Sequence, residues 1–218
     1  MDGMAGNDHA ASLPRATPGD RSMPDRRLAE HKSLLRKDLL AARAAMSVSD
    51  RKAAGHALRD TVLGVPEAGM AGTVAVYLSV GTEPDTTGLV FALWKRGSYV
   101  LLPVLLPDFD LDWASYEGPD SVVTKRYGLL EPVEPGRGTD AIQSADLVIV
   151  PALAADRHGN RLGRGGGCYD RALARVGPAV PTIALIYDHE LLDEVPAGPL
   201  DQRVRMVAQP RAGIFRCR

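Results

Sequence analysis

The sequence is poor in cysteine: Cys168 and Cys217 are its only two among 218 residues. Two cysteines at unrelated spacing cannot supply the ligand set of a structural zinc site or a framework of disulfides. A chain with so little cysteine fits a reducing compartment, where disulfides are rare. This scarcity excludes the small disulfide-stapled and zinc-stapled classes of protein.

Long apolar runs and an excess of one charge are also missing. No apolar stretch reaches the length needed to span a membrane, and the chain does not open with basic residues followed by an apolar segment. Its 26 lysines and arginines nearly balance 27 aspartates and glutamates, with a pI near 6.5. We therefore expect a cytoplasmic protein, with no membrane and no nucleic acid as a partner.

The composition that remains is that of one globular domain, because 45% of the residues are apolar and 24% are charged. Residues 1–25 mix proline, glycine and small polar residues without periodicity. This pattern predicts a disordered N-terminal tail, or a start codon placed too early with Met23 as the alternative start. We predict a domain over residues 26–210 and a C-terminal tail over residues 211–218.

The most informative stretch runs from Asp146 to Val176. A continuous apolar run over residues 147–153 predicts a buried parallel strand that ends near its proline, and helical spacing begins at Tyr169. Four glycines crowd into residues 163–167, between that strand and that helix. Such a loop presents free main-chain N–H groups to a ligand and lets an anion come close, so a phosphate is the natural occupant.

Charged side chains surround this glycine loop. Arg161, Arg164 and Arg171 bring three positive charges to it, and Asp170 beside it is a candidate ligand for a divalent metal. The P-loop and dinucleotide-binding patterns do not fit, because the first needs Gly-Lys-Ser/Thr and the second needs a glycine where Cys168 stands. On pattern alone, a glycine-rich surface turn with solvated arginines stays an alternative.

Two helices are predicted near the N-terminus. Apolar residues at intervals of three, four or seven predict an amphipathic helix over about residues 25–46, on which Lys32 and Arg36 share one face. From spacing alone, that basic pair is better explained as a solvated edge. Ser47 and Asp50 form a capping box that opens a second helix, which we expect to end near Leu63.

A short buried strand is predicted over residues 73–79, followed by a polar turn and another helix. Glu83 and Asp85 fall at the carboxyl end of that strand, where ligands bind in open α/β sheets. Either these carboxylates bind donors on a heterocycle, or Asp85 caps the helix while Glu83 favours its positive end. The residues leave both explanations open.

Further strands are predicted near residues 100, 147, 183 and 204, with an antiparallel appendage over residues 108–125. Strands that alternate with helices are typical of an α/β domain. We therefore predict a single-domain α/β fold of three layers, with a mainly parallel sheet and two N-terminal helices.

The glycine segment, RLGRGGGCYDR preceded by VPALAADRHGN, resembles the signature of the 5-formyltetrahydrofolate cyclo-ligase family, also called methenyltetrahydrofolate synthetases. The segments HKSLLR, LSVGTEPDT and RYGLLEP resemble other family motifs, and the likeness spans about residues 28–209. The family usually has lysine at Gly166, an aromatic at Cys168, histidine at Leu200 and an acid at Arg205. The last departure puts a second metal ligand in doubt.

The resemblance implies a Rossmann-like fold and ATP-dependent, Mg²⁺-assisted conversion of 5-formyltetrahydrofolate to 5,10-methenyltetrahydrofolate, ADP and phosphate. Its partners would be two small molecules, ATP and a reduced folate, and we expect a monomer. It implies Asp170 as the metal ligand. We expect Arg164 to be the catalytic residue, in compensation for the missing family lysine, because it lies two residues from Gly166 and its guanidinium can bind phosphate oxygens. The implied ATP-binding residues are Lys32, Arg36, Arg161, Leu162, Gly163, Arg164, Gly165, Gly166, Gly167, Cys168 and Tyr169. The implied substrate-binding residues are Leu78, Glu83, Arg164, Gly165, Gly166, Gly167 and Cys168.

Other functions remain open at this stage. The substitutions at Gly166, Cys168, Leu200 and Arg205 favour a non-catalytic folate-binding or nucleotide-binding paralogue as the main alternative. An enzyme of similar fold acting on phosphosugars or on CoA would use the same loop for another phosphate. A nucleophilic role for Cys168 at the start of a helix lacks a histidine placed to assist it.

Overall fold

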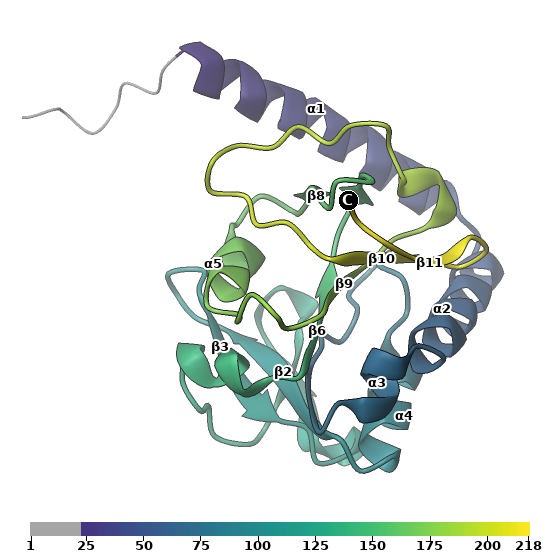
Figure 1. The fold of residues 1–218 in the computed structure, drawn as a ribbon, viewed down its shortest axis with the longest axis vertical. Coiled ribbons are helices and arrows are strands. Elements are labelled where there is room, and N and C mark those ends of the chain that lie inside the picture. The colour runs from purple at the N-terminus through teal and green to yellow at the C-terminus, as the bar shows by residue number, and fades with distance from the viewer. Residues whose placement is uncertain (1–22) are drawn as a thin grey trace, which may run out of the picture.

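The computed structural model describes residues 23–218, which form three layers with a sheet in the middle (Figure 1). The α-helices are α1 (Met23–Ala45), α2 (Val48–Leu63), α3 (Pro66–Met70), α4 (Thr87–Lys95) and α5 (Cys168–Ala174). Short 3-10 helices are η1 (Pro119–Ser121), η2 (Arg126–Gly128), η3 (Thr139–Ser144) and η4 (Asp188–Glu190). The strands are β1 (Thr73–Ala75), β2 (Tyr99–Leu105), β3 (Leu111–Ser115), β4 (Val122–Thr124), β5 (Leu130–Pro132), β6 (Leu147–Pro151), β7 (Ala154–Ala155), β8 (Arg161–Leu162), β9 (Thr182–Leu185), β10 (Met206–Gln209) and β11 (Gly213–Arg216).

The main sheet has seven strands in the order β11-β10-β9-β6-β1-β2-β3 within the described chain. The five inner strands pair in parallel, and the edge strands β3 and β11 are antiparallel to their neighbours. Connections between parallel strands must cross over the sheet, so helices cover its faces. The prediction of an α/β domain with a mainly parallel sheet is confirmed.

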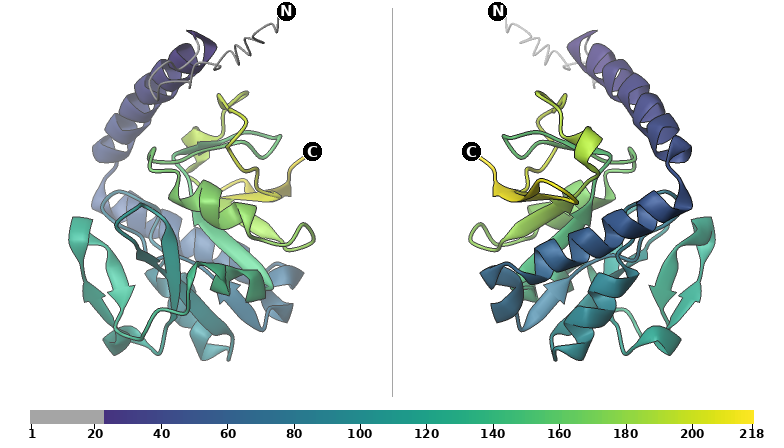
Figure 2. Two further views of the ribbon diagram at one scale, coloured as in Figure 1. Left: turned by 90° about the vertical axis from the view of Figure 1, so that its left-hand side faces the viewer. Right: turned by 90° about the vertical axis from the view of Figure 1, so that its right-hand side faces the viewer.

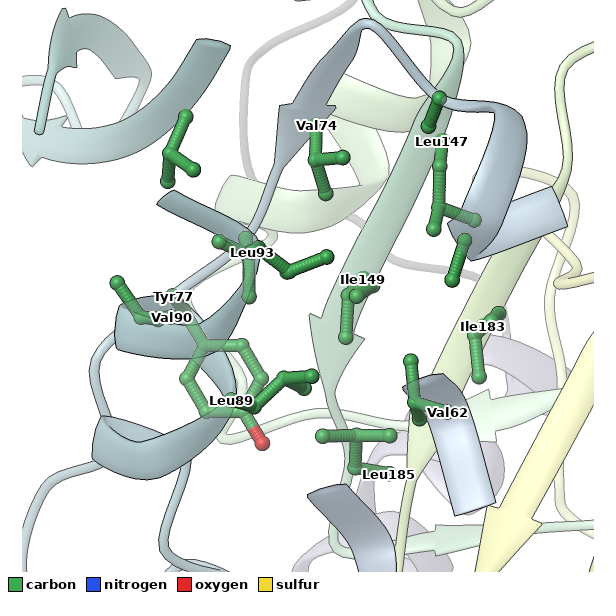
Figure 3. Packing of buried hydrophobic residues seen from close by; sticks show 14 of the residues in the cluster. Val62, Val74, Tyr77, Leu89, Val90, Leu93, Leu147, Ile149, Ile183 and Leu185 are labelled. Atoms are coloured by element: carbon green, nitrogen blue, oxygen red, sulfur yellow. The ribbon is translucent and has the colours of Figure 1, made fainter. Parts of the chain in front are cut away.

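Alternate residues of β6 face opposite layers, as the two-residue period of a strand requires. Leu147 and Ile149 pack in one cluster with α2 and α4, whereas Val148 and Val150 pack in another with α5 and η3. Figure 3 shows Leu147 and Ile149 among the side chains of the first cluster. Because both faces of β6 are buried, its sequence is a continuous apolar run, and this run is the pattern that predicted the strand.

The first strand is shorter than we predicted, since β1 ends at Ala75 rather than at residue 79. Thr86 explains the early end. Its hydroxyl donates to the carbonyl oxygen of Tyr77 at 2.7 Å and accepts from the N–H of Ser79 at 2.9 Å. These bonds replace the ladder of a neighbouring strand, so the chain turns toward α4 while its main-chain polar groups stay paired.

The antiparallel appendage expected over residues 108–125 is wrong in part. Strand β3 pairs along its whole length with β2 and forms an edge of the main sheet. A separate two-stranded hairpin does exist, but it consists of β4 and β5. The C-terminal tail expected over residues 211–218 is also corrected, because β11 lies inside it and pairs with β10.

Both N-terminal helices are present. Ser47 caps α2 by accepting a hydrogen bond from the N–H of Asp50 at 3.0 Å, and the helix ends at Leu63 as predicted. Helix α1 begins at Met23, so the last residues of the expected tail are helical, and residues 1–22 lie outside the described part of the chain.

Helix α1 runs along one side of the molecule (Figure 2). Among its described side chains, Leu39 and Arg43 are the buried ones. The buried side chains of α1 thus lie in its C-terminal half, where Leu35 packs against the same cluster as Leu39, and Lys32 and Arg36 add polar contacts. None of the helices in residues 23–218 combines the length and the apolarity that crossing a membrane would need.

Candidate active site

One large cleft of about 1250 Å³ collects the predicted site residues. Its walls come from α1, the segment after β1, the β2–β3 hairpin and the glycine loop before α5. The predicted residues that line it are Lys32, Arg36, Leu78, Glu83, Arg161, Leu162, Gly163, Arg164, Gly165, Gly166, Gly167, Cys168, Tyr169 and Asp170. Segments that are distant in sequence thus meet around a single cavity large enough for two small molecules.

The glycine loop exposes donors to this cleft. None of the main-chain N–H groups of residues 164–167 donates a hydrogen bond to another residue in the described chain. Gly165 and Gly167 have positive φ values of 105° and 68°, a backbone conformation that favours glycine. Helix α5 has seven residues, so its dipole is short, and the donors that the loop presents to the cleft are its main-chain N–H groups and the nearby arginines.

Arg161 and Asp170 form an ion pair at the base of the loop. The Nη2 of Arg161 donates to the Oδ1 of Asp170 at 2.7 Å, and the N–H of Gln202 donates to the same oxygen at 3.0 Å. Arg161 is 4% exposed, and burial lowers its pKa while the charge of Asp170 opposes that shift. Much of its charge is therefore compensated within the protein, and its Nε is buried without a hydrogen-bond partner.

Helix α1 reaches the cleft through two cations. The Nε of Arg36 donates to the carbonyl oxygen of Gly163 at 2.8 Å, which ties the helix to the glycine loop. The Nζ of Lys32 pairs with Asp201, on the loop before β10. These contacts contradict the solvated-edge explanation, because both side chains face the cleft and have partners in the domain.

On the opposite wall, Arg164 meets Glu83. The Nε of Arg164 lies 3.2 Å from the Oε1 of Glu83, while the other carboxylate oxygen accepts from the N–H of Val80 at 2.9 Å. The N–H of Thr87 donates to Asp85 at 2.9 Å, so Asp85 supports the start of α4. The two carboxylates therefore have different positions. Glu83 lines the cleft, whereas Asp85 binds a main-chain N–H at the start of α4.

Of the four positions that depart from the family pattern, Gly166, Cys168 and Leu200 line the cleft, whereas Arg205 does not. Gly166 does not have a positive φ, and a Cβ atom there would lie 3.1 Å from the Sγ of Cys168. Burial raises the pKa of the Cys168 thiol, which disfavours the thiolate needed for nucleophilic catalysis. Leu200 lines the cleft with 85% of its surface exposed, an unusual exposure for leucine.

Sequence reasoning missed a buried ion pair beneath the cleft. Arg43 donates to both carboxylate oxygens of Glu190, at 2.5 and 2.9 Å, and its Nη2 also donates to the carbonyl oxygen of Ala152 at 2.6 Å. Burial opposes the charge of Arg43, but the bonds and charge of Glu190 raise its pKa overall. Arg43 sits on an otherwise exposed turn of α1, and a lone arginine there gives no signal of burial.

Tyr77 is a second residue that the sequence did not single out. It lines the cleft, is 3% exposed and has a hydroxyl without a hydrogen-bond partner. Burial and the neighbouring Glu83 raise its pKa well above the usual value, so the hydroxyl stays protonated. A tyrosine in a predicted buried strand is normally interpreted as a core residue. Only the cavity beside Tyr77 shows that it also lines the cleft.

The donor set suits a magnesium ion that arrives with a nucleotide rather than one held by protein alone. No group of three or more His, Cys, Asp or Glu side chains in residues 23–218 could hold a metal. Asp170 keeps its second oxygen, Oδ2, free of hydrogen bonds in the described chain. Mg²⁺ commonly takes one or two carboxylates and fills its other positions with phosphate oxygens and water, so this single oxygen fits.

The fold and cleft define a class of protein: an α/β domain whose glycine loop, with its unpaired main-chain N–H groups, shares one cleft with a carboxylate. Comparison with known proteins identifies the family within this class. The sequence model of the 5-formyltetrahydrofolate cyclo-ligase family matches residues 28–210. The chain belongs to this family, and it is an enzyme of the 5-formyltetrahydrofolate cyclo-ligase type, as the resemblance predicted.

Individual relatives from the comparisons carry the same family name. A 5-formyltetrahydrofolate cyclo-ligase of Mycolicibacterium smegmatis is 40% identical over 192 residues, covering 86% of this chain and 97% of the relative. One from Escherichia coli K12 is 32% identical over 171 residues, covering 77% and 94%. The structure of Aquifex aeolicus 5,10-methenyltetrahydrofolate synthetase superposes with a TM-score of 0.74 at 26% identity, covering 86% of this chain and 93% of that one.

Proposed function

We propose that the protein catalyses the ATP-dependent conversion of 5-formyltetrahydrofolate to 5,10-methenyltetrahydrofolate, ADP and phosphate. The observation that carries this proposal is the single cleft that places the glycine loop and its cations opposite Glu83. The glycine loop offers donors to phosphates, and Glu83, which contacts Arg164 of that loop, offers a carboxylate acceptor to a pterin. A reaction between ATP and a folate needs both in one cavity.

The triphosphate would bind at the glycine loop. The free N–H groups of residues 164–167 and the guanidinium groups of Arg36 and Arg164 are donors that suit phosphate oxygens. Lys32 adds a positive charge from α1. Arg161, which is buried and paired with Asp170, would act mainly by holding that carboxylate in place.

The folate would bind with its pterin ring near Glu83. A carboxylate there can accept hydrogen bonds from ring N–H and amino groups, which fixes the orientation of the ring. Leu78 and Tyr77 supply the apolar wall beside it. Arg164 shares the carboxylate of Glu83, so it lies between the proposed phosphate and pterin subsites.

The proposed chemical steps are those that the family resemblance implies. The formyl oxygen attacks the γ-phosphorus, and ADP leaves with the electrons of the broken P–O bond. Nitrogen 10 then attacks the activated formyl carbon, loses its proton, and phosphate departs with the original formyl oxygen. Such a transfer depends on alignment and charge neutralisation rather than on a strong base, and Arg164 is the cation best placed for that role.

Asp170 would hold the Mg²⁺ that accompanies ATP through its free Oδ2. When bound, the ion would neutralise negative charge on the phosphates. Within the protein, Arg161 and the N–H of Gln202 fix the carboxylate by binding its other oxygen. The proposed partners are therefore ATP with Mg²⁺ and a reduced folate.

The test is a direct assay of turnover. Purified protein is mixed with 5-formyltetrahydrofolate and Mg-ATP, and the near-ultraviolet absorbance of the methenyl product is followed together with ADP formation. We expect one ADP for each product molecule, and no product when ATP is omitted. Tight binding of both ligands without any product would contradict the proposal and favour a non-catalytic paralogue.

A further inference from the structure

The cleft has a buried hydroxyl group without a partner in its wall. In residues 23–218, the buried side-chain polar atoms that lack a hydrogen bond include the hydroxyl of Tyr77 and the Nε of Arg161, and both residues line the cleft. Arg161 still binds Asp170 through its Nη2, whereas the hydroxyl is the only polar group of the Tyr77 side chain. An unpaired buried hydroxyl destabilises a folded protein, so its presence at a cleft points to a ligand.

The position of Tyr77 is fixed by its surroundings. The side chain is 3% exposed and packs in the same apolar cluster as Leu89 and Val90 of α4 (Figure 3). The main chain is held as well, because the carbonyl oxygen of Tyr77 accepts a hydrogen bond from the hydroxyl of Thr86 at 2.7 Å. The Tyr77 hydroxyl is therefore preorganised and cannot reach bulk water without unpacking the ring.

The groups around this hydroxyl place it on the cleft side of the ring. Burial raises the pKa of Tyr77, Glu83 and Tyr169 add to the rise, and the charge of Arg43 opposes it. Glu83, Tyr169 and Arg43 all line the cleft. None of these three residues bonds to the Tyr77 hydroxyl in the described chain, so this donor is left for a molecule in the cleft.

The ring edge that Glu83 would bind also carries an acceptor. A pterin has a carbonyl oxygen directly beside a ring N–H, and Glu83 is the proposed acceptor for ring N–H groups. A protonated hydroxyl close to that carboxylate can donate to the adjacent carbonyl oxygen. Glu83 and Tyr77 together thus offer one acceptor and one donor, which match the two neighbouring atoms of the ring.

We propose that the hydroxyl of Tyr77 donates a hydrogen bond to the carbonyl oxygen of the pterin ring, beside the N–H that donates to Glu83. This proposal rests on the proposed function and extends it to a residue that selects the ring. A site that binds a ring through a buried hydroxyl rejects rings without the matching acceptor, because the hydroxyl is then left unpaired. The unpaired hydroxyl of the free protein finds its partner when the folate binds.

The variant Tyr77→Phe removes the hydroxyl and keeps the ring. In calorimetric titrations without ATP, the Kd for 5-formyltetrahydrofolate should rise about fivefold to tenfold. The KM for 5-formyltetrahydrofolate should rise by a similar factor, whereas the KM for ATP should stay unchanged. The Tm of the ligand-free variant should increase by about 2 °C, because the substitution removes an unpaired buried polar group.

The matched control is Tyr116→Phe. Tyr116 is 4% exposed and packs in the same apolar cluster as Tyr77, but it does not line the cleft. This control loses the same hydroxyl group from a buried tyrosine, and its Kd for 5-formyltetrahydrofolate should equal that of wild type.

An unchanged Kd in Tyr77→Phe would overturn the inference, as would an equal rise of the Kd in Tyr116→Phe. A lower Tm of ligand-free Tyr77→Phe would also overturn it, because the hydroxyl would then have a partner in the free protein. Absence of turnover in wild-type protein that binds 5-formyltetrahydrofolate would instead contradict the proposed function, and the titrations would still decide the inference.

Discussion

Arg164 and Glu83 form an ion pair across the cleft, with the Nε of the arginine 3.2 Å from the Oε1 of the glutamate. The pair joins the glycine loop to the segment after β1, and thus the proposed phosphate subsite to the proposed pterin subsite. Arg164 is 53% exposed while Glu83 is 11% exposed, so the arginine is the partner that can move toward a phosphate. This relationship makes Arg164 the first residue to test.

Arg164→Ala should lower kcat by about 10² to 10³, the usual effect of removing a group that stabilises transition-state charge. The family places a lysine where this chain has Gly166, and the backbone there can accept one because its φ is not positive. A small shift of the Cys168 thiol would make room for it. We therefore expect Gly166→Lys to restore part of the activity in Arg164→Ala.

Steady-state assays of wild type, Arg164→Ala, Gly166→Lys and the double variant test whether Arg164 compensates for the missing lysine. Arg211→Ala, on the exposed turn before β11, serves as the control for loss of one arginine. Near-normal kcat in Arg164→Ala would refute the compensation, whatever the double variant does.

Arg36→Ala should raise the KM for ATP about tenfold, because Arg36 ties α1 to the carbonyl oxygen of Gly163 and is a proposed phosphate ligand. Loss of one part-buried hydrogen bond should cost about 1 kcal/mol of stability. The neighbouring cation Lys37 is exposed, so Lys37→Ala is the matched control. An unchanged KM for ATP in Arg36→Ala would remove Arg36 from the ATP site.

Asp170→Asn should lower turnover by at least about 10², because the free Oδ2 of Asp170 is the proposed Mg²⁺ ligand. The amide can still accept the hydrogen bond of Arg161, so the fold should persist. The measurement is turnover across a Mg²⁺ titration, with circular dichroism as the check on folding. Wild-type dependence on Mg²⁺ in the variant would show that the metal lies elsewhere.

Arg43→Ala should destabilise the protein by about 3–5 kcal/mol, because it leaves the buried carboxylate of Glu190 unpaired. The control, Arg59→Ala, removes an arginine whose ion pair with Asp60 is largely exposed and should cost less than about 1 kcal/mol. Urea denaturation of the two variants measures the difference. Similar losses in both would mean that the Arg43–Glu190 pair contributes little to stability.

Acid should weaken the contact between the β2–β3 hairpin and α5. Arg175, just after α5, donates to both oxygens of Asp110, at 2.9 and 2.5 Å, and this holds the pKa of Asp110 below its usual value. A depressed carboxylate pKa adds stability above the unfolded pKa of about 4, and that contribution is lost as the pH falls through the folded pKa.

Asp110→Asn should therefore show a smaller loss of unfolding free energy than wild type between about pH 5 and pH 2. The exposed Asp193 supplies the control, since Asp193→Asn should keep the wild-type pH profile. Identical acid profiles for wild type and Asp110→Asn would contradict the role of this pair.

Local patterns predicted much of the fold and site. The glycine loop between β6 and α5 was predictable because a strand, a turn and a helix follow one another within about thirty residues, each with its own period. The N-cap at Ser47 is local in the same way. These elements depend on neighbours in the chain, and the sequence shows those neighbours directly.

Contacts between distant segments were not predictable. Arg43 and Glu190 are 147 residues apart, and neither stands out from other surface charges in the sequence. The hydroxyl of Thr86 ends β1 early by forming hydrogen bonds with the main chain of Tyr77 and Ser79. No sequence pattern predicts these bonds. The pairing of Arg161 with Asp170 was also not predicted; it compensates the charge of Arg161, while Asp170 keeps its proposed role as the metal ligand.

In the proposed reaction, ATP phosphorylates the formyl oxygen in this cleft. The measurement that tests it most directly is label transfer: 5-formyltetrahydrofolate carrying heavy oxygen in its formyl group is turned over with unlabelled Mg-ATP, and the released phosphate is examined by mass spectrometry. Because the formyl oxygen becomes part of the phosphate, we expect one heavy oxygen in each phosphate and none in the ADP. Phosphate without the label, alongside normal formation of the methenyl product, would contradict it.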